Sequence, residues 1–166
     1  MEETVLNRSM PSNKEAEGAV IGSMIMNRDA IVTTSEMLTR DDFYYSQYGI
    51  LFEAMIELYN EGSPVDLITL QNRLREKNVP PEISSLEFVK DLFESNLTSV
   101  NVKHYARIVA EKAVLRRLIK VTEGIADHCY QDSENLDVIL EDTEKNIFGL
   151  FRTAPMTIMF LSAKWS

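Results

Sequence analysis

The sequence predicts an all-α protein in which a small helical head precedes a long antiparallel helical hairpin. The stretch 100–131 contains no proline and one glycine, Gly124, and its apolar residues recur at helical spacing. A helix of that length extends about 45 Å, which is more than a small head covers. A polar break at 131–133 is followed by a second amphipathic segment, as in a helical hairpin. No stretch alternates cleanly with period two, so no strand is predicted.

Size and composition exclude several classes of protein. The chain has 166 residues, of which 45% are hydrophobic, and this is enough for one domain or for a head with an appendage. The net charge of −9 argues against a direct grip on nucleic acid, which depends on Lys and Arg at phosphates. A single cysteine excludes an intramolecular disulfide and a cysteine-based metal site. No apolar run is long enough for a membrane span and no signal peptide is apparent, so we expect a cytoplasmic protein.

The first two predicted helices follow a leader at residues 1–10. Ser12 can cap a helix that runs to residue 26, with Glu15 three positions later as in a capping box. Its apolar face consists mostly of small residues, which permits close helix packing. After the break that begins at Asn27, Asp29 can cap a short helix that ends near Leu38.

The best candidate for the central core helix lies at 43–59. Asp41 and Asp42 precede it, at a helix start where acidic residues complement the dipole. It ends near Gly62, which suits a left-handed position after a helix. Asp66 can cap the next helix, which two prolines end by residue 81.

The rest of the head and the hairpin complete about seven helices. Ser84 and Glu87 can form a capping box for a helix that carries apolar residues to position 93. We therefore assign the head to 11–97 and the hairpin to 100–152, whose second helix begins at about residue 134. The whole predicted domain is 11–152.

The hairpin carries more apolar surface than its two helices bury against each other, so we expect it to meet another protein. A second copy of the chain is the expected partner, and interfaces of this kind usually exceed about 1,000 Å² in total. Sequence alone does not separate residues at the seam between the two helices from those that face the partner. The candidate contacts are Leu115, Leu118, Ile119, Val121, Ile125, Ile139, Ile147 and Phe151.

Motifs for nucleotide, metal or covalent chemistry are missing from the sequence. There is no G-x-x-x-x-G-K-[ST] loop and no G-x-G-x-x-G, so we expect no nucleotide hydrolysis by this chain, no cofactor and no catalytic residue. His104 and His128 lie on one predicted helix about 36 Å apart, too far to share a metal. Cys129 lies on the apolar face, where a buried inert thiol is expected.

An ordered set of segments resembles the N-terminal domain of the DnaB-type replicative DNA helicases. The resemblance runs from about residue 10 to residue 152. It rests on three groups of residues: Met10-Pro11, Glu15-Ala16-Glu17 and Val20-Ile21-Gly22-Ser23-Met24; Asp42-Phe43-Tyr44, Tyr48, Ile50, Phe52, Leu58, Gly62-Ser63-Pro64, Asp66 and Thr69-Leu70; and Thr98-Ser99, Asn101, Tyr105-Ala106, Ile108-Val109, Glu111-Lys112 and Leu115-Arg116-Arg117-Leu118-Ile119. Ser84-Ser85 stands where members of that family often carry a Gly-Gly pair.

The resemblance implies a role in DNA replication, within the primosome. In those helicases this domain forms a collar on a homohexameric ring, its hairpins pair into dimers, often as a trimer of dimers, and it provides a docking platform for primase. The ATPase and DNA-translocating domain lies downstream. We therefore expect an assembly and partner-docking module without an ATPase site of its own.

The segment 153–166 differs from the family and contains no acidic residue. A shifted reading frame over 154–166 can encode a sequence similar to the family's linker, so we hypothesise a frame change near Thr153; a genuine short C-terminus is the alternative. Two further interpretations of the chain stay open. It is an incomplete copy of an ATP-dependent helicase, or a regulator that co-assembles with full-length helicase rings.

Overall fold

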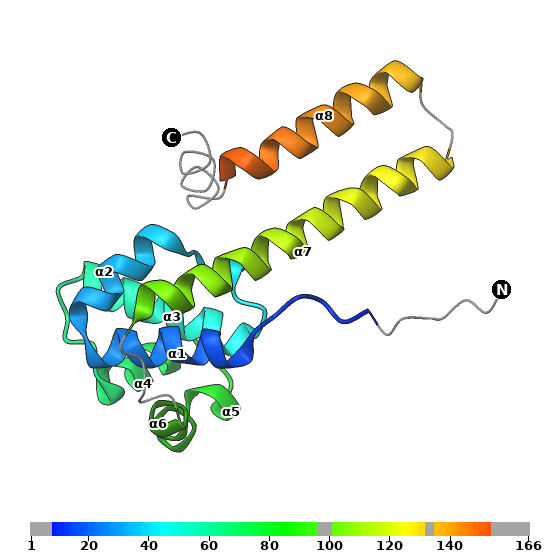
Figure 1. Cartoon of the computed structure of the whole chain (residues 1–166). Coiled ribbons are helices and arrows are strands. Elements are labelled where there is room, and N and C mark those ends of the chain that lie inside the picture. Colours follow the sequence, from blue (N-terminus) through cyan, green and yellow to red (C-terminus); the bar gives the residue numbers. More distant parts are fainter. Residues whose placement is uncertain (1–7, 96–100, 132–134, 154–166) are drawn as a thin grey trace, which may run out of the picture.

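The computed structural model describes residues 8–95, 101–131 and 135–153, and every regular element in these ranges is helical (Figure 1). This confirms the predicted all-α fold. The elements are α1 (Lys14–Met26), α2 (Arg28–Met37), the 3-10 helix η1 (Arg40–Asp42), α3 (Ser46–Asn60), α4 (Leu67–Glu76), α5 (Pro81–Ser84), α6 (Leu86–Ser95), α7 (Val102–Gln131) and α8 (Leu136–Thr153).

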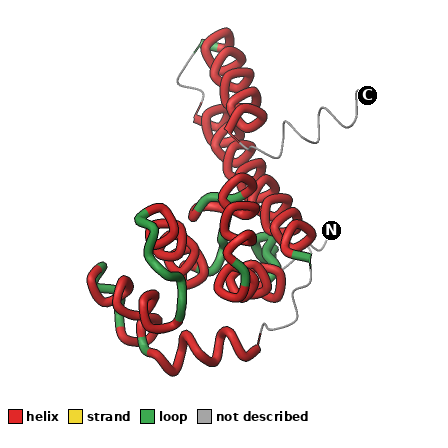
Figure 2. Tube along the Cα trace, turned by 90° about the vertical axis from the view of Figure 1, so that its left-hand side faces the viewer, coloured by secondary structure: helices red, strands yellow, loops and turns green. Residues whose placement is uncertain are grey.

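The helices form a globular head from which α7 projects, and α8 runs back alongside it (Figures 1 and 2). The first part of α7 belongs to the head, where it packs against α1, α2 and η1. Its buried residues are all in this part and include Ala106, Ala110 and Ala113. These alanines allow the helix backbones to approach closely, which seats α7 firmly in the head.

A single hydrophobic core fills the head. The central helix α3 contributes Leu51 and Met55, which are fully buried, and contacts α1, α2 and α4. Leu70 and Leu74 lie one turn apart on α4 and are buried on the same core. The other large side chains that are fully buried are Val20, Ile21, Met24, Ile31, Val89 and Val109.

Two helix starts differ from the predicted ones by one or two positions. The side chain of Asn13 accepts the N–H of Ala16 at 2.8 Å, so Asn13 rather than Ser12 caps α1. Asn27 accepts the N–H of Asp29 at 2.9 Å and caps α2, so Asp29 is not the cap itself. Asn caps the start of each of these two helices, because its side-chain carbonyl oxygen reaches the free N–H groups of the first turn.

The segment after α2 also differs from the prediction. Asp42 ends the short helix η1, and α3 starts only at Ser46. In η1 a capping box links the side chains and backbone of Thr39 and Asp42. The prediction of Gly62 in a left-handed conformation is confirmed by its φ of 73°.

Helix α6 is capped by a different serine from the predicted one. Ser84 is buried and donates to the carbonyl oxygen of Val79 at 3.1 Å. The hydroxyl of Ser85 accepts the N–H of Phe88 at 3.2 Å and therefore caps α6. The short helix α5 precedes α6. Pro80 lies at the N-cap of α5 and Pro81 at its first position, where proline is well tolerated.

Candidate protein-interaction surface

Beyond Ala113 the hairpin has no core of its own. None of the described side chains of α7 past this residue, and none of those of α8, is buried. The two helices contact one another along their length (Figure 2). A pair of helices covers only one face of each, so the other faces stay open to solvent or to a partner.

The eight candidate contacts fall into three groups. Leu115 and Leu118 are exposed, at 44% and 36% of their full accessible surface. Five others are half-buried: Ile119, Val121, Ile125, Ile139 and Ile147. Phe151 lies within α8, but its side chain is outside the described residues.

An exposed row runs along one face of α7. Glu111, Leu115, Leu118, Thr122 and Cys129 are separated by three, four or seven residues, the spacing of one helix face. All five side chains are exposed. The exposure of Cys129 corrects the expectation of a buried thiol, because α8 does not cover this face.

The sequence-based candidates left out exposed apolar residues on α8. Leu136 is 65% exposed, and Leu140 and Phe148 are both 57% exposed. The signal was present in the spacing of Leu136 and Leu140, which lie four residues apart and share a face. These exposed leucines and the exposed phenylalanine make this part of α8 a candidate protein-interaction surface.

The charges along the hairpin are separated. The middle of α7 carries Lys112, Arg116, Arg117 and Lys120, whereas Glu123 and Asp127 lie toward its far end. On α8 the charges are mainly acidic: Asp137, Glu141, Asp142 and Glu144, with Lys145 as a cation. The surface is therefore basic near the head and acidic toward the tip.

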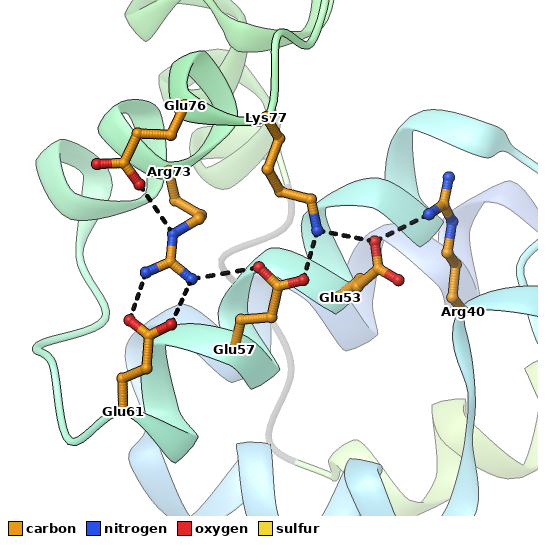
Figure 3. A network of polar contacts seen from close by, with 7 residues as sticks. All are labelled: Arg40, Glu53, Glu57, Glu61, Arg73, Glu76 and Lys77. Carbon is orange, nitrogen blue, oxygen red and sulfur yellow. Dashed lines mark hydrogen bonds and ion pairs between the residues drawn. The ribbon is translucent and has the colours of Figure 1, made fainter.

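A second cluster of charged residues lies on the head, between α3 and α4 (Figure 3). Arg73 donates to Glu57 at 3.2 Å, to Glu61 at 3.0 Å and to Glu76 at 3.2 Å. Hydrogen bonds from Lys77 and Arg73 lower the pKa of Glu57 despite the opposing effect of burial. Because these carboxylates already have cationic partners, the cluster holds two helices together and offers no open site.

The head also carries an open groove of about 710 Å³ between η1 and α3. Phe52 and Ile56 form its apolar lining, and Arg40 on its rim pairs with Glu53 at 2.8 Å. Among the described residues no group of three metal-ligating side chains lies close enough to hold an ion. No described helix is long and apolar enough to span a membrane.

Comparison with known proteins finds the same relatives by sequence and by structure. The family model of the DnaB-like helicase N-terminal domain matches residues 9–111. The chain is similar to the replicative DNA helicase DnaB of Geobacillus stearothermophilus, with 37% identity over 147 residues, and to the replicative DNA helicase DnaC of Bacillus subtilis, with 35% identity over 147 residues. These matches cover 89% of this chain and 32% of each relative, so the chain spans about a third of their length.

Solved structures give the same result. The N-terminal domain of DnaB helicase from Mycobacterium tuberculosis superposes with a TM-score of 0.78 at 29% identity, over 84% of this chain and 99% of that domain. The N-terminal domain of DnaB helicase from Helicobacter pylori, which was described together with its interactions with primase, superposes with a TM-score of 0.61 at 19% identity. It covers 70% of this chain and 90% of that one, and at this identity it supports the fold alone.

Proposed function

Because the chain belongs to the family of DnaB-like helicase N-terminal domains, we propose that it is an assembly and partner-docking module of a replicative helicase. In this proposal the hairpin pairs with the hairpin of a second copy. The observation that carries the proposal is that no described side chain beyond Ala113 is buried, together with the exposed Leu115 and Leu118. Burying such side chains contributes about 25 cal/mol for each Å² removed from water, and a second copy supplies the cover.

We assign the candidate contacts of α7 to two adjoining strips of its apolar side, which differ in exposure. Val121 and Ile125 are half-buried and lie one turn apart, so they belong to the seam with α8. The exposed row with Leu115 and Leu118 faces the second copy, and Ile119 lies at its edge. On α8, Ile139 and Ile147 belong to the seam, whereas Leu140 and Phe148 extend the partner face.

The separated charges favour an antiparallel arrangement of the two copies. In a parallel pair the basic parts of both α7 helices lie side by side, and like charges at close range repel. In an antiparallel pair the basic part of each α7 lies beside the acidic part of the other, which contains Glu123 and Asp127. Charge complementarity of this kind sets the orientation and register of an interface.

Larger assembly and further partners follow from the family. We propose dimers that combine as a trimer of dimers in a hexameric collar, with primase as a docking partner and full-length replicative helicase as a protein with which the chain co-assembles. The relative from Helicobacter pylori supports the primase proposal, since its description names primase interactions. Retention of the chain by immobilised full-length helicase in a pull-down would test co-assembly.

The pairing is tested by Leu118→Asp, which places a charge in the centre of the proposed interface. We expect light scattering to give the monomer mass for this variant and a larger mass for the wild type, with equal helicity by circular dichroism. The control is Ile68→Asp, since Ile68 is exposed on the head and lies away from the hairpin. An unchanged mass for Leu118→Asp with intact helicity would contradict the proposal.

The orientation is tested with the only cysteine in the sequence, Cys129. An antiparallel pair centred near Lys120 separates the two Cys129 positions by about 27 Å at the helical rise, so oxidation of the wild type should give no disulfide-linked dimer. In Glu111→Cys the new thiol lies on the same face, five turns away, and opposes Cys129 of the other copy. Rapid cross-linking of this variant supports antiparallel pairing, whereas rapid cross-linking of the wild type indicates parallel pairing.

A further inference from the structure

Two arginines tie the head to α7 at the point where this helix leaves the head. The guanidinium group of Arg116 donates to the carbonyl oxygen of Pro11 at 2.7 Å and to that of Asp42 at 2.6 Å. It also stacks over the ring of Tyr44, 5.5 Å from the centroid. The neighbouring Arg117 donates to the carboxylate of Asp42. Two consecutive residues of α7 therefore contact Pro11, which precedes α1, and the segment around η1.

The segment that receives these arginines is itself fixed. The second carboxylate oxygen of Asp42 accepts the backbone N–H of Thr39 at 2.7 Å and its hydroxyl at 3.1 Å. From the other side, the buried Glu17 accepts the backbone N–H groups of Tyr44 at 2.8 Å and of Tyr45 at 3.1 Å. Asp42 is itself buried, so these bonds are shielded from water and stronger than the same bonds at the surface.

The same turn of α7 carries exposed apolar residues on its other side. Leu115 and Leu118 flank the two arginines in sequence, and both are exposed. Ala113 is the last described residue of α7 that is buried in the head. The rest of the helix projects beyond the head. Apolar packing therefore anchors α7 only up to Ala113, and the polar contacts act one turn further out.

We propose that Arg116 and Arg117 form a clasp that fixes the angle between the head and the hairpin. When these arginine contacts are formed, the hairpin and the head move as one rigid body. With the clasp open, the helix is held only by its packing up to Ala113, and its tip sweeps a wide range of positions. The inference concerns a single chain and holds whether or not two hairpins pair.

The clasp is tested by measuring the distance between head and tip with two spin labels in the full chain. One label occupies Cys129, and the other occupies a cysteine at the exposed position 36 on α2, introduced as Glu36→Cys. Dilution with unlabelled protein removes distances between copies. We expect a narrow distance distribution for this protein. The double variant Arg116→Gln with Arg117→Gln should broaden it at least twofold.

A matched control separates the clasp from a general effect of charge. Lys112→Gln with Lys120→Gln removes the same charge from the same helix and should leave the distribution narrow. If the arginine double variant does not fold, Arg116→Gln is measured in its place, since this change removes the guanidinium group that bonds the carbonyl oxygens of Pro11 and Asp42. A distribution as narrow as that of the starting protein, in either folded variant, would overturn the proposal. The mass of each variant is followed separately, so failure of pairing is distinguishable from failure of the clasp.

Discussion

The carboxylate of Glu17 lies 2.8 Å from the backbone nitrogen of Tyr44, across 27 positions of the sequence. Glu17 is only 1% exposed, although it is charged and lies in the first turn of α1. Its second oxygen accepts the N–H of Tyr45. A helix side chain thus satisfies two partly buried backbone donors of the segment between η1 and α3.

Glu17→Ala should destabilise the fold strongly. The change leaves two backbone N–H groups without an acceptor, and we expect a loss of about 3 kcal/mol in the free energy of unfolding. Glu17→Gln should lose about half of that, because its carbonyl oxygen still accepts one bond. Urea unfolding measures both values. The control is Glu15→Ala on the exposed side of α1, for which a change of more than about 0.5 kcal/mol would be unexpected.

The stability that depends on Glu17 should also change with pH. Burial raises the pKa of Glu17 above its ordinary value of 4.5, opposed by the two backbone N–H groups and by Arg116. The folded state therefore holds the proton more tightly than the unfolded chain, and this contribution is complete below pH 4.5. It is lost as the pH rises through the folded-state pKa.

Glu17→Gln does not titrate and so provides the reference for this effect. The difference in free energy of unfolding between wild type and Glu17→Gln should move in favour of the variant as the pH rises from 4.5 toward neutrality. Urea unfolding at a series of pH values gives this difference. A difference that stays constant, or that moves in favour of the wild type, contradicts the pKa direction.

Asp66 is the cap that sequence identified correctly, and its removal should weaken α4. Its carboxylate accepts the N–H groups of Ile68 and Thr69, both at 2.9 Å. We expect Asp66→Ala to cost about 1 kcal/mol and Asp66→Asn only a few tenths, since Asn caps nearly as well. These hydrogen bonds lower the pKa of Asp66, so the cap contributes above pH 3.8 and is lost as the pH falls further. Equal losses for the two variants would argue against a capping role.

The charged cluster between α3 and α4 should contribute to stability in a salt-dependent way. Arg73 contacts three glutamates and its pKa is raised, first by the hydrogen bond with Glu61. We expect Arg73→Gln to lower the Tm. We expect the difference in Tm from the wild type to shrink in 1 M salt, because the Debye length is then about 3 Å and the attraction between the charges is screened. Lys90→Gln is the control, because Lys90 and Glu94 form an exposed pair of the kind that contributes little. A decrease in Tm that is the same at low and high salt would point to lost packing instead.

The elements that follow local rules were predictable from sequence, and those set by distant contacts were not. The helical spacing of apolar residues in 100–131 and the cap at Asp66 both depend on residues that lie within two helical turns of one another. Both were therefore identified from the sequence. Asp42 was expected to begin a helix, but its partner Arg117 lies 75 positions away. The burial of Glu17 was missed for the same reason, since its partners are backbone N–H groups that carry no sequence signal.

The exposure of the apolar residues on the hairpin was predictable only in part. Helical spacing identified Leu115 and Leu118, which are exposed. It could not separate them from Val121, because half-burial of this residue depends on how α8 lies against α7. Cys129 was placed on an apolar face, yet the face that carries it is uncovered. Docking of one helix on another decides these cases, and periodicity within one helix does not contain that information.

Two glycines should respond to alanine in opposite directions. At Gly49, on α3, an added Cβ would lie 3.0 Å from the carbonyl oxygen of Arg40 and 3.3 Å from its Cγ. The Arg40 carbonyl is held in η1 by the N–H of Phe43, so it cannot move away freely, and Gly49→Ala should cost about 1–3 kcal/mol.

At Gly124, in the middle of α7, an added Cβ meets nothing within 4 Å. Gly124→Ala should therefore stabilise the helix by about 0.5–1 kcal/mol, because alanine loses less backbone entropy than glycine. Urea unfolding of the two variants beside the wild type measures both effects. A Gly49→Ala protein as stable as the wild type would mean that η1 shifts at little cost, and a destabilised Gly124→Ala protein would mean that another surface covers this side of α7.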